Sequence, residues 1–197
     1  GNIGSARIIK MLDVKDDKLV IESKGINSIE NFLMSRRLMY WQVYLHKTVI
    51  AAKEGITAVI QRARQLTLEG KKVFTTPALH YFLHHHVDRQ FLQEHEDWVS
   101  HFTALDDYDL ECAIKQWQFD PDPILSTLAK NHVTRNLYKV IELASPLSQS
   151  TLEDIRKQVA QFLNIPLQDA SYFAIFKEVH QVLYSSNDDH IQVIFKD

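Results

Sequence analysis

Basic and aromatic residues recur at helical spacing over Asn31–Thr48, which reads NFLMSRRLMYWQVYLHKT. Arg36, Tyr40, Tyr44 and Lys47 fall on one stripe of the predicted helix. Arginine and lysine suit phosphate, and tyrosine supplies a ring to pack on a sugar and a hydroxyl to hydrogen-bond it. The pattern is compatible with a phosphate site. From the pattern alone we favour the simpler interpretation, a half-buried helix whose basic side is solvated.

The opposite stripe of the same helix is apolar. Met34, Leu38, Trp41 and Leu45 recur at helical spacing on that side. We expect this stripe to be buried against a core, which would leave Arg36 facing a polar cleft.

A second candidate site is the histidine-rich motif HYFLHHHVD. His80, His84 and Asp88 are spaced i, i+4 and i+8 and would share a helix face, where imidazole and carboxylate form a metal-ligand set. However, the consecutive residues His84–His86 point in different directions on a helix. We favour a solvated or interface cluster and expect no metal there.

The segment around Asn31–Thr48 resembles a known family. SRRLMYWQVYLHKT, preceded by IKMLDVKDDKLVIESKG, is similar to the post-catalytic part of HD-domain phosphohydrolases, and closest in pattern to the deoxynucleoside triphosphate triphosphohydrolases. There, a short β-hairpin precedes a long helix that carries Arg, two aromatic or His positions and a His-Lys pair. The resemblance is specific over Arg7–Thr48 and looser over LDDYDLECAIKQW and RNLYKVIEL.

The resemblance implies substrate contacts for three residues. Arg36 would contact substrate phosphate, and Tyr44 matches a family tyrosine that packs beneath the sugar. Tyr40 stands where the family has a histidine. We therefore expect Arg36, Tyr40 and Tyr44 to bind substrate.

The resemblance also implies an effector site. His46 and Lys47 match residues that face an effector nucleotide, and Lys24 lies where relatives place a basic residue between subunits. We therefore expect nucleotide partners and a homo-oligomer, formed through the parent protein.

The metal ligands of the family have no match in this chain. They are a His, a His-Asp pair and a later Asp, and all precede the part that this sequence resembles. We therefore expect the chain to be the C-terminal portion of a metal-dependent phosphohydrolase acting on nucleoside triphosphates. It would hold no catalytic residue and no cofactor of its own, the parent enzyme would bind a divalent metal, and the chain alone would be inactive. The alternative is a non-catalytic nucleotide-sensing or oligomerisation module.

The composition and the first residues argue against nucleic-acid-binding, membrane-spanning and secreted proteins. A net charge of −3 over 197 residues does not favour nucleic-acid binding. No apolar run approaches the length of a membrane span, and the start does not look like a signal peptide. The single Cys112 suits a reducing compartment and a small apolar core position. We expect a cytoplasmic location.

The remaining segments predict a mainly α fold, with a helical body, an N-terminal β-hairpin and a small C-terminal α+β appendage. The domains would be residues 1–30, 31–135 and 136–197. Ile114 and Trp117 are core candidates, whereas Arg62 and Arg64 are expected to be exposed. The first predicted element is the hairpin Lys10–Ser23. Helices are predicted at Thr48–Leu68, from Pro77, from Leu105, at Ile124–His132 and at Thr151–Leu163. Strands are predicted at Leu137–Leu143, Tyr172–Phe176 and Ile191–Phe195, and a turn at Ser185–Asp189.

Overall fold

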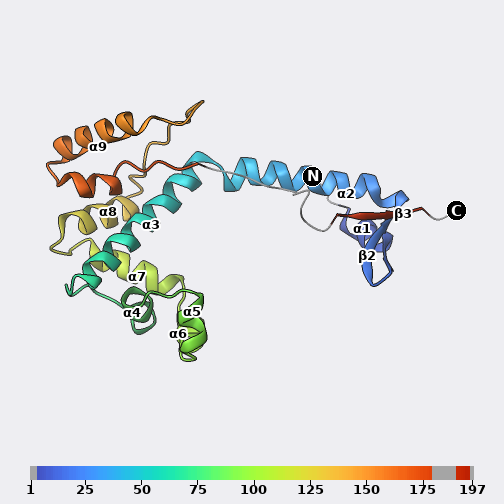
Figure 1. The fold of residues 1–197 in the computed structure, drawn as a ribbon, viewed down its shortest axis with the longest axis horizontal. Coiled ribbons are helices and arrows are strands. Elements are labelled where there is room, and N and C mark those ends of the chain that lie inside the picture. The colour runs from blue at the N-terminus through green and yellow to red at the C-terminus, as the bar shows by residue number, and fades with distance from the viewer. Residues whose placement is uncertain (1–3, 179–189, 196–197) are drawn as a thin grey trace. The chain divides into compact units, whose positions relative to one another are not determined.

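The computed structural model describes residues 4–178 and 190–195. The chain forms two compact units, the first made of residues 1–49 and 177–197 and the second of residues 50–176. Helices dominate, and the described strands form one three-stranded sheet, which confirms the mainly α class (Figure 1). The domain boundaries at residues 30 and 135 stay a prediction.

The first unit contains the predicted hairpin. Asp16 and Asp17 have φ values of 50° and 59°, the left-handed backbone that a two-residue hairpin turn needs. The strands pair antiparallel with Leu12 opposite Ile21, so the hairpin is confirmed. Its elements are α1 (Ser5–Met11), β1 (Leu12–Lys15) and β2 (Lys18–Glu22).

The sheet gains its third strand from the far end of the chain. Strand β3 (Gln192–Ile194) lies parallel to β2, with Val20 opposite Gln192. The prediction of a strand over Ile191–Phe195 is therefore confirmed, but the strand joins the N-terminal hairpin. The predicted turn Ser185–Asp189 lies outside the described residues.

The segment after the hairpin is mostly helical and is interrupted at Leu45 and His46. A short 3-10 turn, η1 (Ser23–Gly25), leads into α2 (Ile26–Met39), a π-helical turn η2 (Tyr40–Tyr44) and then α3 (Lys47–Leu68). No residue of α2 or η2 is buried. The expected burial of the Met34–Leu45 stripe is therefore wrong for this chain: Met34, Leu38 and Trp41 are exposed, and Leu45 is half-buried.

The second unit is built of helices around one core. Trp117 is fully buried, as is Ile114, which confirms both core predictions, and the Trp117 indole donates to the carbonyl of Phe74 at 2.9 Å. The helices after α3 are α4 (Pro77–His84), α5 (Arg89–Glu94), α6 (Trp98–Ala104), α7 (Asp107–Trp117), α8 (Pro123–Val133), α9 (Gln149–Leu163) and the 3-10 helix η3 (Leu167–Tyr172).

Thr, Asp or Ser side chains cap the starts of α4, α5, α7, α8 and α9. Thr76 accepts a hydrogen bond from the Leu79 amide at the start of α4. Asp106 and Asp109 form a reciprocal capping box at the start of α7. The acidic cluster that precedes α7 therefore satisfies backbone amides.

The prediction that Arg62 is exposed is wrong, because its side chain is buried. Its guanidinium reaches Asp122 at 2.7 Å and Asp169 at 3.0 Å. Val59 and Leu66, three and four residues away, are also buried, so helical spacing places Arg62 on the inner face of α3. Two neighbouring carboxylates make a buried cation possible there.

Two predicted strands of the C-terminal appendage are absent among the described residues. Leu137–Leu143 is irregular, and Tyr172–Phe176 begins with the last residue of η3 and forms no strand. Both segments have strand propensity, but a strand also needs a neighbour for its ladder. They meet instead through a side chain, since the Tyr138 hydroxyl donates to the Tyr172 carbonyl at 2.6 Å.

Two further points concern the chain as a whole. Cys112 is exposed on α7, so its predicted core position is wrong; its neighbour Ala113 occupies the buried face of the helix.

No described helix combines the length and the apolar character that crossing a lipid bilayer requires.

Candidate functional site

The three residues expected to bind substrate form one row on the surface of α2 and η2. The Arg36 guanidinium carbon lies 5.5 Å from the ring centre of Tyr40, within cation–π range. The rings of Tyr40 and Tyr44 follow with centroids 4.8 Å apart and planes tilted by 39°. Arg36 and Tyr44 are exposed, so the row offers a cation and an aromatic surface to a ligand.

The π-helical turn helps to keep this row in line. The Leu45 amide donates to the Tyr40 carbonyl at 2.8 Å, five residues back, which is the hydrogen bond of a π-helix. The turn lies beneath Tyr40 and Tyr44 and ends where Leu45 leaves the helical region. Such turns are rare and occur frequently at functional sites. The turn contains neither Gly nor Pro, so residue types did not predict an irregularity there.

The three expected effector residues are not brought together within one chain. Lys24 lies exposed in η1, before α2 begins. His46 and Lys47 lie after η2 ends, where the His46 Nδ1 accepts a hydrogen bond from the Thr48 amide at 3.3 Å. All of α2 and η2 therefore separates Lys24 from the other two.

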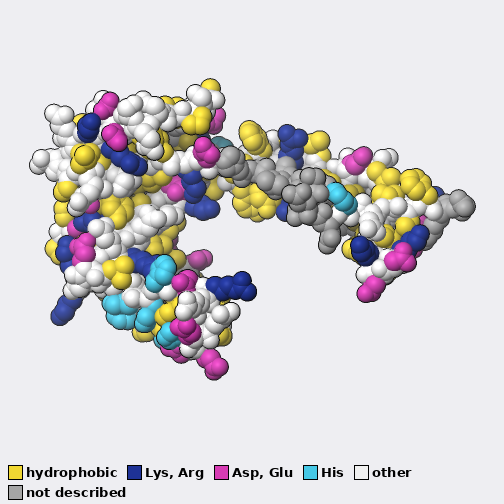
Figure 2. Space-filling model, viewed as in Figure 1, with side chains coloured by type: hydrophobic (Ala, Val, Ile, Leu, Met, Phe, Trp, Pro, Cys, Tyr) yellow, Lys and Arg dark blue, Asp and Glu magenta, His cyan; other side chains and the backbone are white. Residues whose placement is uncertain are grey.

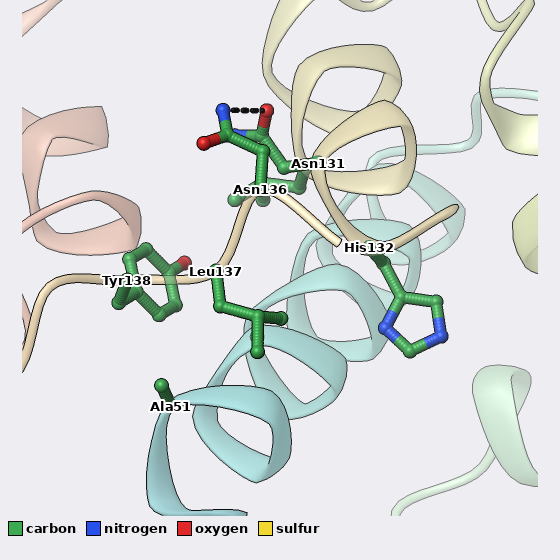
Figure 3. Close-up of a pocket in the computed structure, with 8 residues that line it drawn as sticks. Ala51, Asn131, His132, Asn136, Leu137 and Tyr138 are labelled. Atoms are coloured by element: carbon green, nitrogen blue, oxygen red, sulfur yellow. Dashed lines mark hydrogen bonds between the residues drawn. The ribbon is translucent and has the colours of Figure 1, made fainter. Parts of the chain in front are cut away.

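A small cavity in the second unit does not suit a nucleotide. It lies between α3 and the segment that follows α8, with Asn136 donating to Asn131 at 3.0 Å on its wall (Figure 3). About 20 Å³ is open inside it, which is room for one water molecule. Ligand pockets typically hold about 300 Å³ or more. The eight lining residues are Ala51, Gly55, Leu128, Asn131, His132, Asn136, Leu137 and Tyr138.

Histidines gather over α4, α5 and α6, as Figure 2 shows. The rings of His80 and His84 lie with centroids 3.7 Å apart and planes tilted by 31°, and burial together with the charges of His84 and His85 lowers the pKa of His80. Asp88 does not share their face, contrary to the helical spacing, because α4 ends at His84 and Asp88 caps α5.

The described residues do not fit a catalytic metal. Over residues 4–178 and 190–195, no group of three or more His, Cys, Asp or Glu side chains could hold a metal ion. A divalent site would need at least such a set of donors.

Comparison with known proteins gives the class of this chain. Residues 3–81, which include the hairpin and the Arg36–Tyr40–Tyr44 row, match the family described as the HD associated region. Over 99% of its length, the chain is similar in structure to a phosphohydrolase from Bacteroides thetaiotaomicron VPI-5482, with a TM-score of 0.89 and 46% sequence identity. The chain is therefore related to HD-type phosphohydrolases.

A curated relative is the uncharacterized protein YwfO of Bacillus subtilis (strain 168). It is 30% identical over 142 residues, which are 72% of this chain and 31% of that protein. The similarity to the phosphohydrolase covers 48% of that chain. This chain thus spans about half the length of one relative and about a third of the other.

Proposed function

We propose that this chain forms the C-terminal portion of an HD-superfamily, metal-dependent phosphohydrolase that acts on nucleoside triphosphates. In this proposal α2 and η2 supply contacts to the phosphate and the sugar. The observation that carries it is the exposed row of Arg36, Tyr40 and Tyr44. The similarity to a phosphohydrolase supports a phosphorylated substrate, and a cation followed by two aromatic rings matches the chemistry of a nucleotide.

Each member of the row has its own role. Arg36 carries a permanent charge on a planar fork, so it can hold phosphate oxygens in a fixed direction. Tyr40 lies under that fork and restricts its motion, which reduces the entropy lost on binding. Tyr44 presents the next ring, on which a sugar would pack. A phosphate held in this way is oriented for attack, and its developing charge is stabilised.

The described residues do not supply the metal-dependent part of the proposed reaction. Because they do not fit a catalytic metal, the metal of such an enzyme would be held by the rest of the parent polypeptide. The chain alone is therefore expected to bind nucleotide weakly and to hydrolyse none.

The separation of Lys24 from His46 and Lys47 supports an oligomer. One effector nucleotide that contacts all three would require the ends of two α2 helices, and hence two chains. We place this homo-oligomer in the cytoplasm, because the exposed thiol of Cys112 suits a reducing compartment.

The test of the proposal is Arg36→Ala in the full-length protein. We expect a loss of about 2–4 kcal/mol of transition-state stabilisation, the scale for one preorganised charge-stabilising donor. Arg36→Lys should recover part of the activity, because an ammonium is not a planar fork. The measurement is kcat/KM for metal-dependent hydrolysis of deoxynucleoside triphosphates.

The matched control is Arg37→Ala. Arg37 is also exposed on α2, but it follows Arg36 directly and so points about 100° away from the row. This variant should keep wild-type turnover. Unchanged turnover in Arg36→Ala, with unchanged thermal unfolding, would contradict the proposal.

A further inference from the structure

The helix that carries the Arg36–Tyr40–Tyr44 row is interrupted directly after the row ends. Leu45 leaves the helical region with a φ of −97° and a ψ of 8°, and α3 begins at Lys47. Residues 40–48 include neither Gly nor Pro, so the usual helix breakers do not explain the interruption. Another known cause is a side chain that inserts into the ladder of helical hydrogen bonds.

His46 provides such a side chain. In an uninterrupted α-helix the Thr48 amide would donate to the Tyr44 carbonyl, four residues back. It donates instead to the Nδ1 atom of His46, at 3.3 Å. The Val49 amide donates to the His46 carbonyl at 2.8 Å. His46 therefore satisfies two of the first amides of α3, which have no partner inside that helix.

This pair of hydrogen bonds makes His46 the capping residue of α3. A residue directly before a helix caps it when its side chain accepts a hydrogen bond from the second or third amide of the helix. Lys47 is the first residue of α3, and Thr48 is the second. The cap uses Nδ1 of the ring and leaves Nε2 available, so a ligand could contact the same ring at its other nitrogen.

We propose that His46 is a positioning residue of the row and acts through Tyr44. By starting α3 afresh, it ends the preceding helix at the π-helical turn, whose last residue is Tyr44. That turn holds the Tyr44 ring 4.8 Å from the Tyr40 ring. If the helix ran on without the cap, the Leu45 amide would leave the Tyr40 carbonyl for an α-helical partner, and the π-helical turn would be lost. The ligand-binding role of the row itself rests on the proposed function.

The test is His46→Ala in the full-length protein. Loss of a helix cap typically costs about a factor of five in the local folding equilibrium, so hydrogen exchange over residues 45–49 should be faster by about that factor. A displaced Tyr44 ring should raise KM for deoxynucleoside triphosphates about as much and change kcat little, because the ring packs on the sugar before and during reaction. His46→Asn should recover most of both losses, since Asn is a preferred cap.

The matched control is Thr48→Ala. It also places an alanine beside the interruption, but it keeps the backbone amide that donates to His46. Exchange over residues 45–49 and KM should both stay at the wild-type values in this variant.

Unchanged exchange over residues 45–49 in His46→Ala would overturn the proposal. So would a KM that rises equally in His46→Ala and His46→Asn, because His46 would then contact a ligand directly. The exchange measurement does not depend on hydrolysis. If exchange is faster in His46→Ala but Arg36→Ala keeps full turnover, the capping role of His46 stands and the proposed function fails.

Discussion

At the scale of single residues, Arg62 joins three segments of the second unit. From α3 it reaches Asp122, the residue that caps α8, and Asp169 in η3, and its guanidinium lies 5.7 Å from the Tyr172 ring. The hydrogen bond to Asp122 raises the pKa of Arg62. Burial alone would raise the pKa of Asp122, but the bonds from Arg62 and the Leu125 amide outweigh it and hold that pKa below its usual value.

Arg62→Met should destabilise the second unit strongly. The substitution leaves Asp122 and Asp169 buried without their cation, and breaking a buried pair in this way costs about 3–5 kcal/mol. Urea unfolding followed by the fluorescence of buried Trp117 measures the loss. Arg37→Met, at an exposed position, is the control and should change the free energy of unfolding by less than about 0.5 kcal/mol. Equal stability of the two variants would show that the network contributes nothing net.

At the scale of elements, the hairpin and α2 are joined by one close approach. A Cβ atom on Gly25 would lie 2.7 Å from the Cβ of Met11 and 2.8 Å from the side chain of Ile21. The φ of Gly25 is −90°, so the position needs glycine for space and not for backbone conformation. The 3-10 turn therefore holds α1 and β2 close together at the start of α2.

Gly25→Ala should loosen the first unit. The added methyl meets a Cβ that cannot move aside, and overpacking of this kind typically costs about 1–3 kcal/mol. Amide exchange of Val20 and Ile21 in β2 should accelerate accordingly. Gly4→Ala is the control, because its nearest contact would be an ordinary 3.9 Å, and it should leave these rates unchanged. Unchanged exchange in Gly25→Ala would mean that the turn relaxes freely.

At the scale of the whole molecule, stability should depend on alkaline pH through Tyr138. Burial, with a smaller effect of the Glu54 charge, raises the pKa of Tyr138 to about 12. The side chain anchors residues after α8 to the end of η3 through its bond to the Tyr172 carbonyl. Neutral Tyr138 is therefore part of the packed second unit.

The free energy of unfolding should fall as the pH rises from about 10 to about 12. In this range an unfolded tyrosine loses its proton while folded Tyr138 keeps it, so rising pH favours the unfolded state. Tyr138→Phe should flatten this slope, and it should cost about 1 kcal/mol at neutral pH through the lost hydrogen bond. Exposed Tyr108→Phe should keep the wild-type slope. Tyr172 and Tyr81, whose pKa values are also raised by burial, contribute to any slope left in Tyr138→Phe. An unaltered slope in Tyr138→Phe would assign the effect to another group.

The sequence by itself determined the local features. Turn residues and caps act within a few residues, so the hairpin around Asp16 and Asp17 and the helix start at Thr76 were predictable from residue types and spacing. The row of Arg36, Tyr40 and Tyr44 was predictable for the same reason, because i, i+4 neighbours meet on any helix.

Only the tertiary structure decided what depends on distant partners. Arg62 is buried because Asp169, far along the chain, neutralises it, and β3 pairs with the N-terminal hairpin through a free edge of β2. Leu137–Leu143 pairs with no described strand, and Tyr138 in this segment bonds to the Tyr172 carbonyl through its side chain. The Met34–Leu45 face is exposed for a related reason: periodicity identifies an apolar face, but burial requires a surface to cover it, and the described residues supply none.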